Sequence, residues 1–105
     1  MEKVTIYRGV SSTEAVIVHG LGPEELGDRW TTDQETAQMF ATWRKGGVFR
    51  MVVDSSLCVI TRNSHPNRFK VKMEGLSRDE WATLEYRNFA ESIFRNIHFK
   101  LLTNN

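Results

Sequence analysis

The sequence predicts an α+β domain in which a small, largely antiparallel sheet carries two main helices. Short runs of β-branched and aromatic residues recur between glycines and turn residues, as strands do. Two longer stretches place apolar residues at helical spacing behind a candidate N-cap. Since 105 residues are enough for one hydrophobic core and little more, we expect a single domain over residues 1–105.

Composition and charge narrow the functional classes. With 14 basic and 13 acidic residues the net charge is +1, so no overall field predicts a nucleic-acid or membrane surface as partner. The single cysteine, Cys58, excludes an internal disulfide and is typical of a reducing cytoplasm. No apolar run approaches the length of a membrane span, and the first residues show no apolar leader segment. We therefore expect a cytoplasmic protein without a membrane partner.

The first strand is expected over residues 4–7, where apolar and polar positions alternate. It runs into Arg8 and Gly9, and the glycine allows the backbone to approach another group closely. Ser11 or Ser12 can then cap a short helix through residues 14–18, although an extended conformation fits that apolar run almost as well.

A second strand ends in Trp30, Thr31 and Thr32 and leads into the first main helix. Thr32 and Glu35 have the Thr-x-x-Glu spacing of a capping box, in which each side chain binds the other residue's backbone N–H. Apolar positions continue at helical spacing behind this cap, and the glycines at 46 and 47 end the helix.

Three further strands are expected in the following part of the chain. They cover residues 48–53, 57–61 and 69–74, and a loop over residues 63–67 precedes the last of them.

The second main helix is predicted to be the longest. Ser77 and Glu80 have the spacing of another capping box, and apolar residues at helical spacing follow for roughly five turns, up to Ile97. A last short strand is expected over residues 98–102.

Several kinds of site receive no support from the sequence. The histidines at 19, 65 and 98 lack the spacing of metal ligands, and one cysteine cannot form a zinc knuckle, so we expect no metal site. Neither a catalytic-triad signature nor a phosphate-binding glycine loop is present. The modest basic segment is typical of a solvated strand face rather than of a nucleic-acid interface; it comprises Arg62, Arg68, Lys70 and Lys72.

Two strand ends carry residues suited to a phosphorylated sugar. The Arg8 guanidinium offers a planar fork of donors to phosphate oxygens, and Gly9 lets such a phosphate reach the backbone. The hydroxyl groups of Thr31 and Thr32 can orient a ribose. A later carboxylate can stabilise the positive charge that develops when a glycosidic bond breaks; the candidates are Glu74, Glu80 and Glu85.

The order and spacing of these residues resemble the ADP-ribosyltransferase family over about the first half of the chain. The matching segments are Tyr7-Arg8-Gly9, Trp30-Thr31-Thr32 and the helix that contains Ala37, Phe40 and Ala41. The resemblance implies a split sheet whose strands hold NAD in a cleft between two small sheets. It also implies that Arg8 and Gly9 contact the pyrophosphate and that Thr31, with Thr32 beside it, supports the nicotinamide ribose.

The family usually places its glutamate at the start of a late strand, often in a Glu-x-Glu or Gln-x-Glu pair. Here Glu74 ends a predicted strand and Glu85 falls within the predicted long helix. The resemblance implies that one of these two carboxylates stabilises the ribosyl cation. The chain would then be an NAD-dependent mono-ADP-ribosyltransferase-like protein that modifies a protein or another macromolecular acceptor.

Each of these residues also has a simpler interpretation. Arg8 can pair with a nearby acid at the surface, Thr31 and Thr32 can serve only as strand and cap residues, and Glu74 and Glu85 can be solvated. The three tryptophans can be core residues or anchors of a protein interface. A second hypothesis therefore stays open, in which the chain is a catalytically silent binding protein, such as a phage or mobile-element anti-defence inhibitor of a host protein.

Overall fold

A computed structural model describes residues 2–59, 68–88 and 91–97 and shows an α+β fold, as the sequence predicted. Within these ranges, seven antiparallel strands form one sheet in the order β4-β5-β2-β1-β3-β6-β7. The strands are β1 (Lys3–Val10), β2 (Arg29–Thr31), β3 (Gly47–Asp54), β4 (Cys58–Val59), β5 (Arg68–Val71), β6 (Glu85–Asn88) and β7 (Arg95–Asn96).

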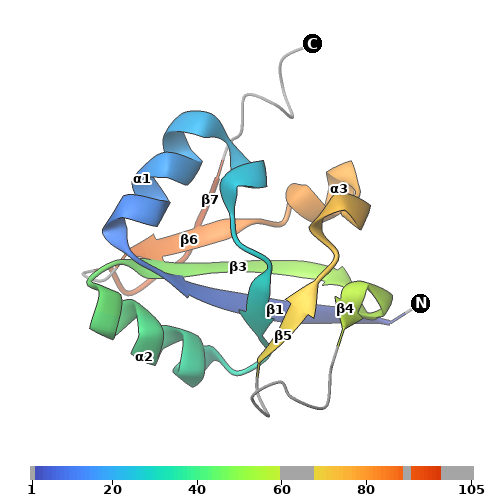
Figure 1. The fold of residues 1–105 in the computed structure, drawn as a ribbon, viewed down its shortest axis with the longest axis horizontal. Helices are drawn as coiled ribbons and strands as arrows, with labels where there is room; N and C mark the ends of the chain where they lie inside the picture. The colour runs from blue at the N-terminus through green and yellow to red at the C-terminus, as the bar shows by residue number, and fades with distance from the viewer. Residues whose placement is uncertain (1, 60–67, 89–90, 98–105) are drawn as a thin grey trace.

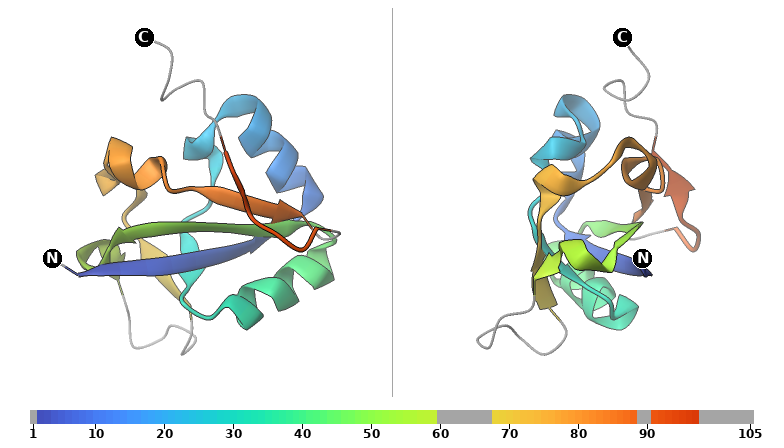
Figure 2. Two further views of the ribbon diagram at one scale, coloured as in Figure 1. Left: turned by 180° about the vertical axis from the view of Figure 1, so that it is seen from behind. Right: turned by 90° about the vertical axis from the view of Figure 1, so that its right-hand side faces the viewer.

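The two longer helices, α1 (Ser12–Leu21) and α2 (Gln34–Arg44), lie on either side of strands β1 and β3 (Figures 1 and 2). A short helix α3 (Arg78–Trp81) and three 3₁₀ turns complete the described elements; the turns are η1 (Pro23–Glu25), η2 (Ser55–Leu57) and η3 (Met73–Gly75). Among the residues that the structure describes, no helix is long and apolar enough to cross a membrane.

The main hydrophobic core lies between α1 and one face of the sheet. Alternate residues of β1 and β3 point into it, because successive side chains of a strand face opposite sides; its buried members include Ile6, Val18, Trp30, Phe49, Met51 and Leu84. A smaller cluster on the opposite face joins Ala37 and Ala41 of α2 to Val48 of β3. Each long helix thus buries one apolar face against its own side of the sheet.

The sheet opens between β1 and β2. Strand β1 pairs with β3 along all 8 of its residues, from Lys3 to Val10. It pairs with β2 only through Tyr7 and Thr31, so the two strands separate beyond this point. The opening lies beside Arg8 and Gly9 of β1 and the first residues of β2.

The two longer helices begin at side-chain caps. Of the two conformations left open for residues 14–18, the structure has the helix, and Ser11 is its N-cap, with its hydroxyl accepting the Glu14 N–H. The capping box predicted from Thr32 and Glu35 is wrong, because Asp33 is the N-cap of α2. Its carboxylate accepts hydrogen bonds from the Glu35 N–H at 3.1 Å and the Thr36 hydroxyl at 2.8 Å, which makes it the better cap.

The long helix predicted from Ser77 to Ile97 is also wrong. The capping box of Ser77 and Glu80 is present, but helix α3 ends at Trp81, and the chain then forms β6. Strand β6 pairs with residues 47–50 of β3 and so completes the hydrogen bonds of an otherwise open edge. Backbone pairing along β3 therefore overrides the apolar spacing that suggested a helix.

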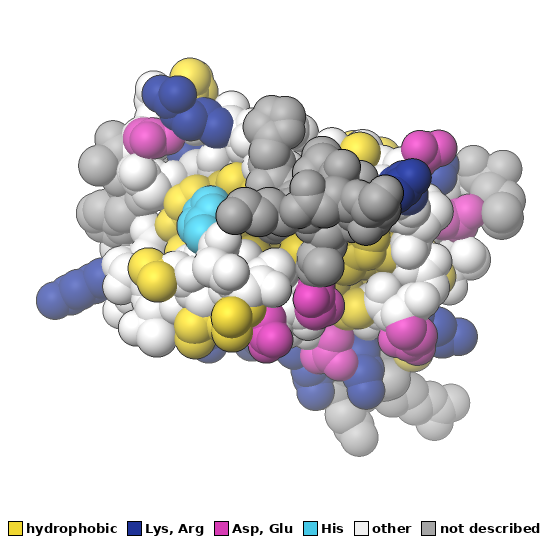
Figure 3. All heavy atoms as spheres, turned by 90° about the horizontal axis from the view of Figure 1, so that it is seen from above, with side chains coloured by type: hydrophobic (Ala, Val, Ile, Leu, Met, Phe, Trp, Pro, Cys, Tyr) yellow, Lys and Arg dark blue, Asp and Glu magenta, His cyan; other side chains and the backbone are white. Residues whose placement is uncertain are grey.

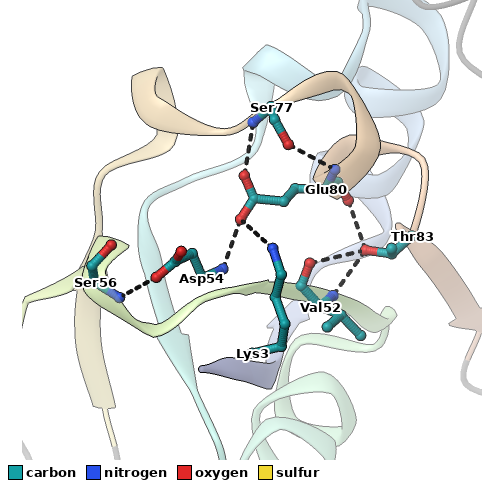
Figure 4. Close-up of polar contacts among 7 residues, drawn as sticks. All are labelled: Lys3, Val52, Asp54, Ser56, Ser77, Glu80 and Thr83. Carbon is teal, nitrogen blue, oxygen red and sulfur yellow. Dashed lines mark hydrogen bonds and ion pairs between the residues drawn. The ribbon is translucent and has the colours of Figure 1, made fainter. Parts of the chain in front are cut away.

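Side-chain hydrogen bonds hold α3 and β6 against β3 (Figure 4). The Glu80 carboxylate accepts the backbone N–H of Asp54 at 2.6 Å and that of Ser77 at 2.9 Å. The Thr83 hydroxyl accepts the Val52 N–H at 2.8 Å and donates to the Glu80 carbonyl at 2.6 Å. These contacts fix the turn that redirects the chain from helix into strand.

Other predicted elements differ in extent. The strand expected over residues 69–74 ends at Val71, and Glu74 lies in η3. Of the strand expected over residues 57–61, Leu57 lies in η2, Cys58 and Val59 form β4, and residues 60 and 61 lie outside the described residues. The predicted loop over residues 63–67 and the predicted last strand over residues 98–102 lie outside the described residues.

Candidate functional site

The opening between β1 and β2 forms a cleft whose lining is rich in arginine. Four arginines contribute to it from four elements: Arg8 from β1, Arg29 from β2, Arg44 from α2 and Arg68 from β5. The other lining residues are Tyr7, Gly9, Trp30, Thr31, Ala37 and Phe40. We call this feature the arginine cleft.

Arg8 links three elements at one end of the arginine cleft. Its guanidinium donates two hydrogen bonds to the Glu14 carboxylate of α1, at 2.9 and 3.1 Å, and one to the Arg29 carbonyl of β2 at 2.9 Å. The Arg8 side chain is only 14% exposed. Arg8 therefore holds the two separating strands in place, and Glu14 balances its charge.

Gly9 and Thr31 form the floor of the arginine cleft, next to α2. A side chain at Gly9 would overlap the Ala37 carbonyl and approach the Ala41 nitrogen to 2.9 Å, so only glycine lets α2 pack this closely. Thr31 is buried, and its hydroxyl accepts the Asp33 N–H at 3.0 Å. The packing of α2 thus fixes the backbone on both sides of the opening.

Two arginines contact the ring of Phe40 in the wall of the arginine cleft. The guanidinium carbon of Arg68 lies 4.6 Å from the ring centroid, and that of Arg44 lies 5.7 Å from it. Arg68 stands opposite Thr31 in the register of β5 and β2. Cation–π contacts of this kind orient the guanidinium groups without neutralising them.

The positive charges of the arginine cleft are poorly balanced. Burial lowers the pKa of the Arg68 guanidinium, and the charges of Arg29, Arg44 and Arg8 lower it further. Among the described residues, no ion pair joins Arg29, Arg44 or Arg68 to a carboxylate. The stretches 60–67, 89–90 and 98–105 contain no aspartate or glutamate side chain that could supply one. The arginine cleft is therefore suited to an anion.

The arginine cleft is shallow. Its volume of about 20 Å³ is close to the space one water molecule needs, so it cannot enclose a nucleotide. A charged group of a ligand can enter it only if the rest of the ligand lies across the surface outside.

The two candidate glutamates lie outside the arginine cleft. Glu85 is the first residue of strand β6 and not, as predicted, part of a long helix. The Glu85 carboxylate pairs with Arg50 at 2.7 Å. Successive register pairs place Glu85 three strands from Thr31, or about 14 Å at ordinary strand spacing. Glu74 is exposed in η3 and borders a different hollow, together with Asp28 and Lys70.

A third hollow, of about 130 Å³, lies between α2 and the strands β3 and β6. It is larger than the arginine cleft, but its charged lining residues, Arg87 and Glu91, have opposite signs. Because these two charges offset each other, this hollow attracts a charged ligand less than the arginine cleft does, and none of the site residues predicted from the sequence lines it.

The structure therefore brings together three of the residues predicted to bind a cofactor and leaves out the fourth. Arg8, Gly9 and Thr31 line the arginine cleft, whereas Thr32 is exposed and does not. Sequence analysis missed Arg29 and Arg44 and treated Arg68 as part of a solvated face. Their convergence depends on the order of strands β5, β2 and β1, for which the sequence contains no local signal.

Comparisons with protein-family models, curated proteins and solved structures found no match to this chain. Among the described residues, no group of three or more His, Cys, Asp and Glu side chains could hold a metal ion.

Proposed function

We propose that this chain is an ADP-ribosyltransferase-like protein that binds NAD at the arginine cleft. The observation that supports the proposal most is the place where the sheet opens. Arg8, Gly9 and Thr31, which the family resemblance assigns to NAD, line the two sides of that opening. Three further arginines lie beside them, and guanidinium groups suit a pyrophosphate.

The proposed roles differ in one respect from those that the resemblance implies. Arg8 is engaged by Glu14 and the Arg29 carbonyl, so it shapes the arginine cleft, and Arg29, Arg44 and Arg68 meet the pyrophosphate. Thr31 and Gly9 fix the backbone of the two strands beside the opening, and the nicotinamide ribose lies at the surface outside it. Thr32 is exposed and does not line the arginine cleft, so it would contact only the part of the ligand that lies at the surface.

The transfer step requires a stabilised ribosyl cation. The bond between the ribose and nicotinamide breaks, nicotinamide leaves with the electron pair, and a protein or other macromolecular nucleophile adds to the ribose. Glu74 and Glu85 lie away from the arginine cleft, and Glu85 is already paired with Arg50. We therefore expect this protein to bind NAD but to cleave its bond to nicotinamide slowly.

Calorimetric titration of the purified protein with NAD tests the proposal. Arg29→Ala is the variant of choice, because the Arg29 side chain is exposed and its loss leaves the Arg8–Glu14 pair intact. We expect it to weaken NAD binding by about tenfold, the effect of losing one charge-assisted hydrogen bond. Arg78→Ala, which removes an exposed arginine of α3, is the matched control and should bind like the original protein. Absence of binding at millimolar NAD would refute the proposal.

A second candidate function, binding to a protein partner, is favoured by exposed apolar side chains on α1. Val16 is 69% exposed and Leu21 66%, and hydrophobic side chains gather over this helix when the molecule is seen from above (Figure 3). Exposed apolar side chains on one helix are candidate anchors for a protein partner. If a host or target protein is recovered in stoichiometric complex with this chain, the double variant Val16→Ser, Leu21→Ser should no longer bind it. The Arg29→Ala variant should still bind it. A complex that survives the α1 substitutions would exclude this surface.

A further inference from the structure

The charge of the arginine cleft limits which nucleotides it can bind well. Of its four arginines, Arg8 alone has a carboxylate partner within the described residues, and that partner is Glu14. Arg29, Arg44 and Arg68 come from three different elements and hold their positive charges around one small opening. Bringing like charges together costs free energy in the empty protein, and a bound anion offsets that cost.

The walls of the arginine cleft also point to a phosphoryl group. Arg44 and Arg68 both contact the Phe40 ring, which holds their two guanidinium groups beside the same side chain. A volume of about 20 Å³ is close to the space of one water molecule, so it admits one phosphoryl oxygen and excludes a sugar or a base. The remainder of the ligand then lies at the surface, within reach of the same positive field.

A cationic group on the ligand would be repelled by this field. NAD carries a positive nicotinamide ring, which cancels one of its two phosphate charges, whereas ADP-ribose has the same pyrophosphate and no such ring. Among the described lining residues, no carboxylate is present to attract the ring. The residue opposite Thr31 on β5 is Arg68, so this edge of the opening is itself cationic.

We propose that the arginine cleft prefers ADP-ribose to NAD, and more generally prefers nucleotides whose pyrophosphate charge is not offset by a cationic group. This inference rests on the proposed function, because that function supplies the adenine nucleotide as ligand. It goes beyond the proposed function by naming ADP-ribose, not NAD, as the ligand that binds more tightly. At a half-exposed site, one elementary charge at several ångströms changes affinity by about tenfold. ADP-ribose should therefore bind about tenfold more tightly than NAD at low salt.

The test is a set of calorimetric titrations of the full chain with ADP-ribose, NAD and inorganic phosphate. The preference for ADP-ribose should shrink as salt is raised, because salt screens half-exposed charges. Arg44→Glu should reduce or abolish the preference, since it places a negative charge at the exposed end of α2. Arg44→Lys keeps the charge and should keep the preference, and Arg78→Glu on α3 is the matched control.

The outcomes separate this inference from the proposed function. Binding of NAD as tight as that of ADP-ribose would overturn the inference and leave the proposed function standing. Binding of ADP-ribose with no detectable binding of NAD would support the inference and overturn the proposed function. Inorganic phosphate that binds as tightly as ADP-ribose would overturn the nucleotide assignment, and no binding of any of the three would overturn both.

Discussion

Arg8 and Glu14 show how one residue can serve the fold and the site together. The pair is mostly shielded from solvent, with side chains 14% and 21% exposed, and Arg8 also binds the Arg29 carbonyl. Since the guanidinium joins α1, β1 and β2, loss of Arg8 would leave Glu14 without its partner and would loosen the opening. Weaker ligand binding by Arg8→Ala would therefore have two causes, the disturbed arrangement of α1, β1 and β2 and the missing guanidinium in the arginine cleft. Substitution of Arg29 is the clearer test because it leaves the Arg8–Glu14 pair intact.

Glu80 is a structural carboxylate whose replacement we expect to destabilise the fold. Its side chain is buried and accepts the N–H groups of Ser77 and Asp54, which join α3 to the end of β3 (Figure 4). Glu80→Gln should lower the free energy of unfolding by roughly 2 kcal/mol at neutral pH, since charge-assisted hydrogen bonds are lost. Urea denaturation measures this effect, and Glu74→Gln, at an exposed carboxylate, is the control.

The same carboxylate predicts a pH dependence. Burial alone would raise the pKa of Glu80, but hydrogen bonds from Ser77 and Asp54 outweigh it and hold that pKa below the usual value of 4.5. The stabilising contribution is therefore complete above pH 4.5 and is lost as the pH falls through the lower pKa of the folded state. The stability difference between the original protein and Glu80→Gln should shrink in that acid range; a difference that grows there would contradict this account.

At the scale of elements, the contact between α2 and β1 depends on Gly9. Gly9→Ala should destabilise the protein by roughly 1–3 kcal/mol, because the new methyl group would overlap the Ala37 carbonyl and force α2 away from the sheet. Gly20→Ala in α1 is the matched control. Apart from the two chain neighbours and the backbone of its own helix, no atom lies within 4 Å of the added methyl group, and alanine favours a helix, so stability should rise slightly. Thermal unfolding of the two variants measures both effects, and equal behaviour would exclude the tight contact.

The elements that sequence analysis placed well are those set by local signals. Strand β3, the Ser11 cap of α1 and the capping box of Ser77 and Glu80 all follow from neighbouring residues. The chain after Trp81 could not be assigned in this way, since its apolar spacing fits a helix while β3 requires a partner strand. Likewise, Asp33 rather than Thr32 caps α2 because the Thr36 hydroxyl completes the cap.

At the scale of the whole molecule, the arginine cleft is a product of topology. Arg8, Gly9 and Thr31 could be chosen from the sequence because each was expected at a strand end; β1 in fact continues to Val10, so Arg8 and Gly9 lie in its last three residues, and Thr31 ends β2. Arg29, Arg44 and Arg68 could not, because their proximity arises only when β5, β2 and β1 take their order and α2 packs beneath them. The net charge of +1 gives no sign of this local concentration of charge.

The most direct test of the central claim, that the arginine cleft is the ligand site, is an NMR titration of the isotope-labelled protein with NAD and with ADP-ribose. We expect the largest backbone shifts at Gly9, Trp30, Thr31 and Phe40, with only small shifts in α3 and η3, whose residues do not line the arginine cleft. Shifts concentrated near Glu74 or between α2 and β6, with Gly9 and Thr31 unaffected, would contradict the account.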